Sequence, residues 1–202
     1  ADLVVTVRPA KSRKALVYFG GNGEDVSYNL PALSLAFPEH AIYLLHYRGY
    51  GGSTGSPSEA DISTDALALF EKVHAEHTDV LVMGRSLGSG VAVRLASQRP
   101  VSRLVLITPY DSIQNLAADQ FPWLPVRWLL RDSYESVKYA PAIATPTLLL
   151  EAERDELIPS ASTRRLLAAF KPGIASLKVI PGAGHNDISE APVYMAALQG
   201  KP

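Results

Sequence analysis

The sequence predicts an α/β protein with a mostly parallel central sheet and helices on both faces of that sheet. Two observations lead to this prediction. Apolar runs of about five residues recur along the chain, and stretches with helical spacing separate them. Runs that are apolar on both faces are typical of parallel strands covered by helices. The alternation of strands with helices favours repeated strand–helix–strand units in one sheet.

The individual elements follow from these patterns. The apolar runs predict strands at residues 3–7, 15–19, 41–47, 79–83, 103–107, 147–151 and 177–180. Helical spacing predicts helices at residues 63–76, 87–98, 161–170 and 194–198. Pro100 follows the second of these helices and ends it, because proline cannot continue a helix.

The least regular part of the sequence is residues 109–146, which contain five prolines. The aromatic side chains Phe121, Trp123 and Trp128 lie there among leucines. Two interpretations stay open: a small helical cap or pocket wall, and a packed connection between strands. Since no repeat or low-complexity linker divides the rest, we expect a single domain over residues 1–202.

Composition narrows the functional classes. The net charge of −1 provides no basic field, so we expect no nucleic-acid partner. The absence of cysteine removes disulfides, thiolate metal sites and a cysteine nucleophile. No apolar run reaches the ~18–20 residues of a membrane span. The first residue is Ala1 rather than Met, so a periplasmic or membrane-anchored protein with an earlier leader stays open beside a cytoplasmic one. The sequence carries no signal of oligomeric state.

The most informative segment is Gly84-Arg85-Ser86-Leu87-Gly88, which follows an apolar run and precedes a helical stretch. This spacing is that of a nucleophile elbow. Such a turn holds the serine in a strained conformation and brings neighbouring chain so close that a side chain at either glycine would clash. It also places the hydroxyl at the amino end of a helix, which favours negative charge. We predict Ser86 as a nucleophile; the alternative is a purely structural glycine-rich turn.

A serine hydroxyl attacks poorly until a base takes its proton. His185 lies in residues 181–187, a glycine-rich loop after the last predicted strand. From such a loop an imidazole can reach the sheet edge where Ser86 emerges. We therefore predict His185 as the base.

The other four histidines have simpler interpretations. His74 and His77 lie near the end of a surface helix, where a metal pair would lack an apparent third ligand. His40 lies in the approach to a strand. His46 lies at a strand end near the expected active edge, where a packing role is favoured over substrate contact.

The acid that orients the base should follow another strand, between the serine and the histidine in chain order. Asp155 meets this condition, in a turn after the apolar run at residues 147–151. It would accept a hydrogen bond from the imidazole and stabilise the imidazolium. Asp111 is a rival, whereas Glu151 and Glu153 lie within or just after the strand and are disfavoured.

An oxyanion that develops during attack needs two preset donors. One should be the backbone N–H of Leu87, directly after the nucleophile. The other should come from Phe19-Gly20-Gly21-Asn22-Gly23, with Asn22 first and Gly21 second. An ordinary glycine turn is the alternative. A phosphate-binding loop is excluded because no Gly-Lys-Ser/Thr follows.

At these motifs the sequence resembles the α/β-hydrolase superfamily over nearly its whole length. More narrowly, it is similar to small minimal-lid hydrolases whose eukaryotic relatives include membrane-anchored protein depalmitoylases and lysophospholipid lipases. The resemblance implies an α/β-hydrolase fold with a short or minimal cap, a triad of Ser86, Asp155 and His185, and oxyanion donors at Asn22 and Leu87. The segments that carry it are residues 19–23, 47–53, 84–88, 154–159 and 184–187.

The sequence departs from the resembled family in two places. Family members usually carry His-Gly where this chain has Gly20-Gly21, so the oxyanion loop is expected to differ in shape. The chain also lacks the amino-terminal cysteine cluster that anchors the animal depalmitoylases, so a depalmitoylase role is not inherited.

The predicted reaction is acyl transfer to water from a small-molecule ester or thioester, with no metal or organic cofactor required. The alternatives are a non-catalytic ligand-binding protein on the same fold and an amide or C–C hydrolase. Residues expected to line the substrate pocket are Gly21, Tyr110, Phe121, Trp123 and Trp128.

Overall fold

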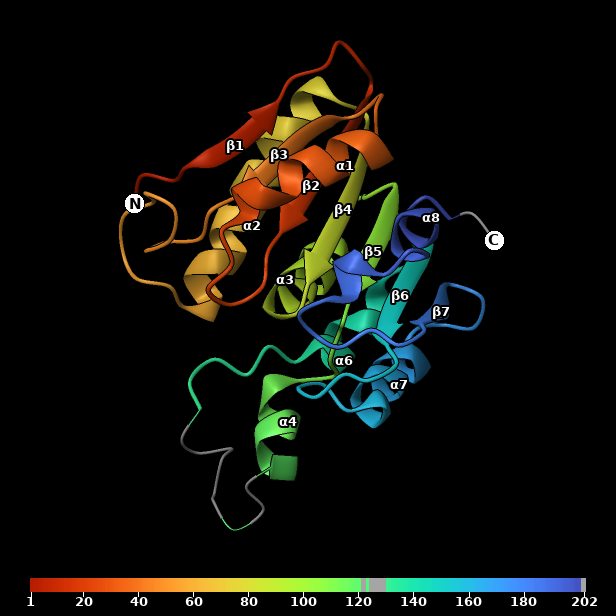
Figure 1. Ribbon diagram of the computed structural model, residues 1–202. Coiled ribbons are helices and arrows are strands. Elements are labelled where there is room, and N and C mark those ends of the chain that lie inside the picture. The colour runs from red at the N-terminus through yellow and green to blue at the C-terminus, as the bar shows by residue number, and fades with distance from the viewer. Residues whose placement is uncertain (121–122, 124–129, 201–202) are drawn as a thin grey trace.

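The computed structural model describes residues 1–120, 123 and 130–200 and contains a seven-stranded sheet with the order β1-β3-β2-β4-β5-β6-β7 (Figure 1). Only the pairing of β1 with β3 is antiparallel; the other neighbours in the sheet are parallel. The predicted mostly parallel α/β fold is therefore confirmed. The strands are β1 (Val5–Arg8), β2 (Lys14–Phe19), β3 (Ala41–Leu45), β4 (Asp79–Arg85), β5 (Arg103–Ile107), β6 (Thr147–Ala152) and β7 (Ala175–Ile180).

Helices cover the sheet in two layers. The helices are α1 (Leu30–Ala36), α2 (Glu59–Glu76), α3 (Leu87–Ala96), α4 (Ile113–Gln120), α6 (Ser136–Tyr139), α7 (Ser160–Ala169) and α8 (Tyr194–Leu198). Short 3-10 turns lie at η1 (Val26–Asn29), η2 (Ala140–Ala142) and η3 (Ile188–Glu190).

Each face of the sheet carries its own apolar core. Ala15, Val17 and Phe19 of β2 pack with the buried sides of α2, α3 and α7. Leu16 and Tyr18 of the same strand pack with α1 and α8 on the opposite side (Figure 1). Since successive side chains of a strand point to opposite faces, the central strands must be apolar throughout, and this is the pattern that the sequence shows.

The parallel strands bring their carboxyl ends to one edge of the sheet. At that edge Phe19 of β2 lies opposite Gly84 of β4, and Ala152 of β6 lies opposite Ile180 of β7. The loops that follow these strands therefore meet, although they come from distant parts of the sequence.

Some elements differ from the prediction at their ends. α2 begins at Glu59, earlier than predicted, because the side chain of Ser58 accepts a hydrogen bond from the amide of Asp61 and caps the helix. The predicted strand at residues 41–47 ends at Leu45, where its pairing with β1 ends. The short helix α1 was not predicted. α4 and α6 lie within residues 109–146, where a small helical cap was one of the two interpretations.

Within the described ranges, no helix is both long enough and apolar enough to span a lipid bilayer.

The turn between β4 and α3 is packed without room for side chains at its two glycines. A Cβ on Gly84 would lie 2.2 Å from the carbonyl oxygen of Gly88. A Cβ on Gly88 would lie 2.1 Å from the carbonyl oxygen of Phe19 in β2. Because both opposing atoms belong to the backbone, neither glycine can accept a side chain unless the sheet or the helix moves.

We expect Gly88→Ala to lower the free energy of unfolding by at least about 2 kcal/mol, because α3 must move away from β2. Gly173→Ala is the matched control, since a Cβ there meets nothing within 4 Å. The substitution should lower the free energy of unfolding by only about 1 kcal/mol, because alanine is strained in the left-handed conformation of this residue (φ +81°). Urea unfolding of both variants measures the difference. Equal losses of stability would contradict the steric explanation.

Candidate active site

Ser86 occupies a strained turn between β4 and α3. Its backbone has φ 49° and ψ −118°, in the left-handed range that residues with side chains rarely adopt. Its amide donates to the carbonyl of Ile107 over 2.9 Å, and its own carbonyl accepts from the amide and hydroxyl of Ser89 over 2.8 and 2.7 Å. These bonds hold the serine at the carboxyl edge of the sheet in spite of the strain.

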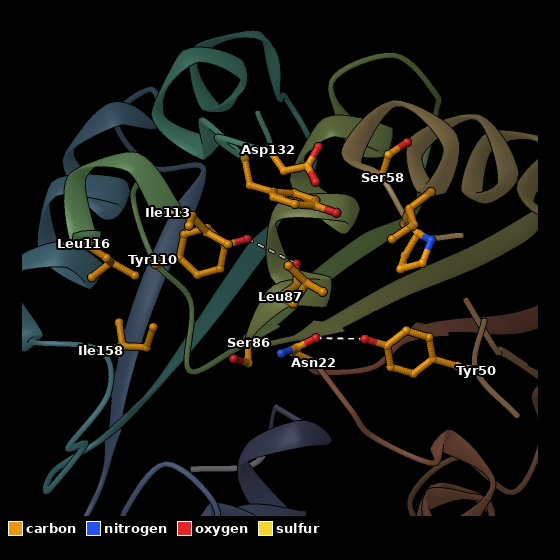
Figure 2. Close-up of a pocket in the computed structure, with 13 residues that line it drawn as sticks. Asn22, Tyr50, Ser58, Ser86, Leu87, Tyr110, Ile113, Leu116, Asp132 and Ile158 are labelled. Atoms are coloured by element: carbon orange, nitrogen blue, oxygen red, sulfur yellow. Dashed lines mark hydrogen bonds between the residues drawn. The ribbon is translucent and has the colours of Figure 1, made fainter. Parts of the chain in front are cut away.

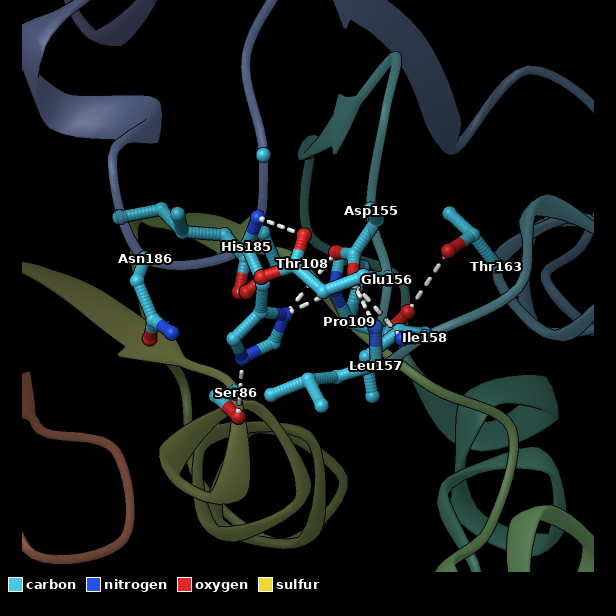
Figure 3. Close-up of polar contacts among 12 residues, drawn as sticks. Ser86, Thr108, Pro109, Asp155, Glu156, Leu157, Ile158, Thr163, His185 and Asn186 are labelled. Atoms are coloured by element: carbon cyan, nitrogen blue, oxygen red, sulfur yellow. Dashed lines mark hydrogen bonds and ion pairs between the residues drawn. The ribbon is translucent and has the colours of Figure 1, made fainter. Parts of the chain in front are cut away.

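His185 lies between the serine and a carboxylate (Figure 3). Its Nε2 is 3.0 Å from the Oγ of Ser86, and its Nδ1 is 2.9 and 3.0 Å from the two carboxylate oxygens of Asp155. An ionised carboxylate can only accept, so in the neutral imidazole the proton belongs on Nδ1. Nε2 is then free to accept the proton of the serine hydroxyl.

Asp155 is fixed by its own turn. One of its carboxylate oxygens accepts hydrogen bonds from the amides of Leu157 and Ile158, over 2.9 and 2.7 Å. The side chain is 5% exposed. A buried carboxylate must be hydrogen-bonded to remain charged, and these two amides together with His185 meet that need.

The loop that carries His185 is held by three carboxylates. The amide of Gly182 donates to Glu153, that of Gly184 to Asp187, and that of His185 itself to Glu156, over 2.6, 2.6 and 3.2 Å. Glu156 approaches from the turn of Asp155 (Figure 3). The position of the imidazole is therefore fixed through its backbone as well as through its ring.

Backbone donors lie beside Ser86. The N–H of Leu87 is the first of α3 and has no acceptor within the helix. The loop after β2 also reaches the serine: a Cβ on Gly21 would lie 3.6 Å from the Cβ of Ser86. The N–H of Gly21 is occupied by Glu24 over 2.6 Å, whereas the N–H of Asn22 has no hydrogen-bond acceptor among the described residues. This geometry favours Asn22 over Gly21, the second choice from the sequence.

A cavity of about 400 Å³ opens beside Ser86 (Figure 2). Its walls are largely apolar and come from α2, α3, α4 and the turn after Asp155. The hydroxyl of Tyr50 donates to the side-chain oxygen of Asn22 over 2.9 Å at one rim. The side chains that give the cavity its apolar character are Ile62, Leu87, Tyr110, Ile113, Leu116, Tyr134 and Ile158.

Residues 10–136, more than half of the chain, match the protein family described as "Serine aminopeptidase, S33". The chain belongs to this hydrolase family. Its membership confirms the resemblance to the α/β-hydrolase superfamily that the motifs predicted.

Individual relatives agree with this membership. An uncharacterized Mycobacterium tuberculosis protein, Rv2307c, is 36% identical over 181 residues, which cover 87% of this chain and 64% of the relative. Lysophosphatidylserine lipase ABHD12 of Macaca fascicularis is 30% identical over 187 residues, 81% of this chain and 47% of the lipase. The chain therefore spans between about half and two thirds of the length of these relatives.

The fold also matches solved structures. The crystal structure of Paleococcus ferrophilus monoacylglycerol lipase superposes with a TM-score of 0.75 at 19% identity, over 99% of this chain and 98% of that one. At this identity the likeness shows that the two chains share the α/β-hydrolase fold.

The predicted pocket residues of this α/β hydrolase have different positions. Tyr110 lines the cavity, and its hydroxyl donates to the carbonyl of Leu87 over 3.2 Å. Gly21 lies beside Ser86 but outside the described lining, and Trp123 is 74% exposed and also outside it. Phe121 and Trp128 fall outside the described residues. Among the described residues, side chains of α4 and Tyr134 form part of the apolar wall, and the polar residues within α4 obscured its apolar face in the sequence.

The remaining histidines of the hydrolase have structural partners. His46 is buried, and its Nε2 is 2.8 Å from the hydroxyl of Thr6. The ring of His74 stacks on Phe70. His77 is bonded to the carbonyl of Ser12 and to the hydroxyl of Tyr43, and so is not directed toward a shared metal with His74. Across the described ranges, no group of three histidine, aspartate or glutamate side chains is placed to hold a metal ion.

Asp111, the rival acid, has its hydrogen-bond partners in α4 and α7 rather than at His185, and so connects the end of β5 to these helices. Its carboxylate accepts from Ser162, Arg165 and Asn115 over 2.5, 2.6 and 2.9 Å. Burial acts to raise the pKa of Asp111, but these hydrogen bonds outweigh burial and leave the pKa below its usual value.

We expect Asp111→Asn to lower the free energy of unfolding by about 2–3 kcal/mol at pH 7, because charged hydrogen bonds are lost. A lowered folded-state pKa stabilises the fold above the unfolded-state pKa of about 4, and this contribution disappears as the pH falls through the folded value. The difference between wild type and variant should therefore shrink from pH 7 to about pH 3. Urea unfolding at both pH values measures it.

The control is Asp119→Asn, which removes a 59% exposed partner of the same arginine and should cost less than about 1 kcal/mol. A penalty for Asp111→Asn that stays constant with pH would show that its charge does not stabilise the fold.

Proposed function

We propose that this hydrolase cleaves carboxylic esters or thioesters through an acyl-enzyme on Ser86. The observation that carries the proposal is the unbroken hydrogen-bonded path from Ser86 through His185 to Asp155. Membership of a hydrolase family and the similarity to a lysophosphatidylserine lipase support activity on esters.

In the first half of the proposed reaction, Ser86 Oγ attacks the acyl carbonyl while His185 Nε2 takes its proton. Asp155 stabilises the imidazolium that forms. The negative charge on the carbonyl oxygen is stabilised by the N–H groups of Leu87 and Asn22. His185 then gives its proton to the leaving alcohol or thiol, and the acyl group stays on the serine.

In the second half, water takes the place of the serine hydroxyl. His185 removes a proton from the water, which attacks the acyl-enzyme and forms a second tetrahedral intermediate. Its collapse returns the proton to Ser86 and releases the carboxylic acid. The same oxyanion donors serve both halves, and each proton moves through the same imidazole nitrogen.

The cavity supports an apolar acyl group as the recognised part of the substrate. Its apolar walls lie directly beside Ser86, and burial of methylene groups there would contribute about 0.8 kcal/mol each to binding. We therefore propose a short or medium acyl chain, with the leaving group at the open side of the cavity.

We expect Ser86→Ala to abolish turnover of p-nitrophenyl butyrate while the fold is retained, because only the attacking oxygen is lost. The fall in kcat should be of the order of 10⁵–10⁶, and the unfolding transition should be unchanged or shifted slightly upward. Release of p-nitrophenol and thermal unfolding are the two measurements.

Labelling by a fluorophosphonate separates the proposal from its alternatives. Wild type should be labelled at Ser86, and the alanine variant should not. A wild-type chain that binds apolar ligands but resists labelling would indicate a non-catalytic binding protein. Turnover of anilides without turnover of matched esters would indicate an amide hydrolase instead.

Asp155→Asn should lower kcat about 10⁴-fold with little change in KM, because the amide permits the wrong tautomer of His185. Asp111→Asn is the matched control, since this carboxylate has no contact with His185 and its loss should leave kcat within about threefold. Initial rates with one ester measure both variants. Equal losses would contradict a specific role of Asp155 in orienting His185.

A further inference from the structure

We infer that Glu24 and Arg85 are positioning residues that fix two active-site loops relative to each other. The loops are the oxyanion loop, residues 20–24 after β2, and the base loop, residues 181–187 after β7. The inference deepens the proposed function and rests on it: neither side chain needs to touch the substrate, and both act through groups that do.

Glu24 has a partner for each of its acceptor positions. One carboxylate oxygen accepts from the hydroxyl of Tyr18 over 2.7 Å and from the side-chain amide nitrogen of Asn29 over 2.6 Å. The other accepts from the N–H of Gly21 over 2.6 Å and from Nη1 of Arg85 over 3.1 Å. A carboxylate offers about four such positions, so this side chain, 12% exposed, is held on all sides.

The bond to Gly21 sets which amide of the oxyanion loop faces the substrate. Glu24 accepts a hydrogen bond from the N–H of Gly21 and so fixes the turn of this loop. The next N–H along the chain is that of Asn22. Without this bond the loop would lose the contact that orients the peptide before Asn22. A donor misplaced by about 1 Å loses most of its effect on a developing oxyanion.

Arg85 extends the same network to the base. It precedes Ser86 in the chain, and its Nη2 donates to the carbonyl of His185 over 3.2 Å while its Nη1 donates to Glu24. The guanidinium is a planar fork, so one side chain can hold both partners at fixed separation. Glu156 holds the amide of His185 on the other side of the same residue. The base loop is thus held relative to both the nucleophile and the oxyanion loop.

The pair also controls charge beside the reacting serine. A Cβ on Gly21 would lie 3.1 Å from a carboxylate oxygen of Glu24 and 3.6 Å from the Cβ of Ser86, so the carboxylate lies near the site of the oxyanion. An unpaired negative charge there would oppose a second one. Arg85 neutralises Glu24, and the loop keeps the geometric benefit of the carboxylate without that repulsion.

Tyr18 contributes a permanent donor to the network. Burial raises the pKa of its hydroxyl well above the usual value, and the neighbouring charge of Glu24 raises it further. The phenol therefore keeps its proton and donates to the oxygen of Glu24 that faces neither Gly21 nor Arg85.

The test compares Glu24→Gln, Arg85→Met and the double variant in the whole chain. Active sites are titrated with a fluorophosphonate, and kcat is expressed per titrated site. Each single variant should lower kcat about 10²-fold and change KM by less than about threefold, because the loss falls on the transition state. The double variant should lose little more than the worse single variant, since both break one network.

Three further measurements separate positioning from stability. Asp111→Asn, which breaks a buried carboxylate network outside the two loops, should lose thermal stability but keep kcat per site within about threefold. Arg85→Lys should recover part of the kcat lost in Arg85→Met, and it provides a second test if Glu24→Gln does not fold. A boronic acid, which forms a tetrahedral adduct on the serine, should bind more weakly to Glu24→Gln, whereas a carboxylate product should not.

Unchanged kcat per titrated site in Glu24→Gln and Arg85→Met, or strictly additive losses in the double variant, would overturn the inference. Failure of the proposed function is distinguishable from this result. In that case wild type would show no labelling at Ser86, and Ser86→Ala would turn over ester as wild type does. If Ser86→Ala is inactive while Glu24→Gln is fully active, the proposed function stands and only the positioning role of Glu24 and Arg85 is contradicted.

Discussion

The contact between α3 and the strands beneath it is the constraint on which the site depends. A side chain on Gly88 would meet the carbonyl of Phe19, and one on Gly84 would meet the carbonyl of Gly88. This close packing forces the residue between the glycines into its left-handed conformation and holds Ser86 above the sheet edge. The same approach brings the end of β2 beside the first turn of α3. Ser86, the proposed nucleophile, and the loop proposed to support its oxyanion are therefore placed by one packing contact.

Two buried carboxylates organise the rest of the site in different ways. Asp155 accepts from two amides and from the ring of His185, so its charge acts directly on the base. Glu24 accepts from Gly21 and Arg85, so its charge is neutralised and its effect is geometric. A buried charge is costly unless hydrogen bonds and an opposite charge offset its lost hydration. Both residues meet this requirement with donors from the loops that they hold. The N–H groups of each loop stabilise the carboxylate, and the same hydrogen bonds order the loop.

The sequence predicted the parts of the molecule that depend on periodicity and chain order. Central strands buried on both faces leave apolar runs, and topology then places the ends of those runs together. This reasoning predicted that Ser86, Asp155 and His185 meet, and their side chains are hydrogen-bonded to one another in the structure. Glu24 and Arg85 were missed as partners because their roles depend on side-chain directions across loops that are distant in sequence. The apolar wall was expected at Trp123 but comes partly from Ile113 and Leu116, because the helix that carries them also contains polar residues that obscure its spacing.

One part of the cavity wall, around Tyr134, depends on a different part of the fold from Ser86, His185 and Asp155. Glu59, at the first turn of α2, accepts hydrogen bonds from the amides of Ser133 and Tyr134 over 2.8 and 2.9 Å, while its own amide donates to Asp132 over 2.9 Å. Tyr134 has a positive φ of 40°, and these bonds hold that strained residue against the cavity. Ser86, His185 and Asp155 are instead fixed by strand ends and their turns. Among the described residues, Glu59, Asp132, Ser133 and Tyr134 share no hydrogen bond with Ser86, His185 or Asp155. Changes in this part of the wall can therefore alter which substrate group fits while the distances between Ser86, His185 and Asp155 stay the same.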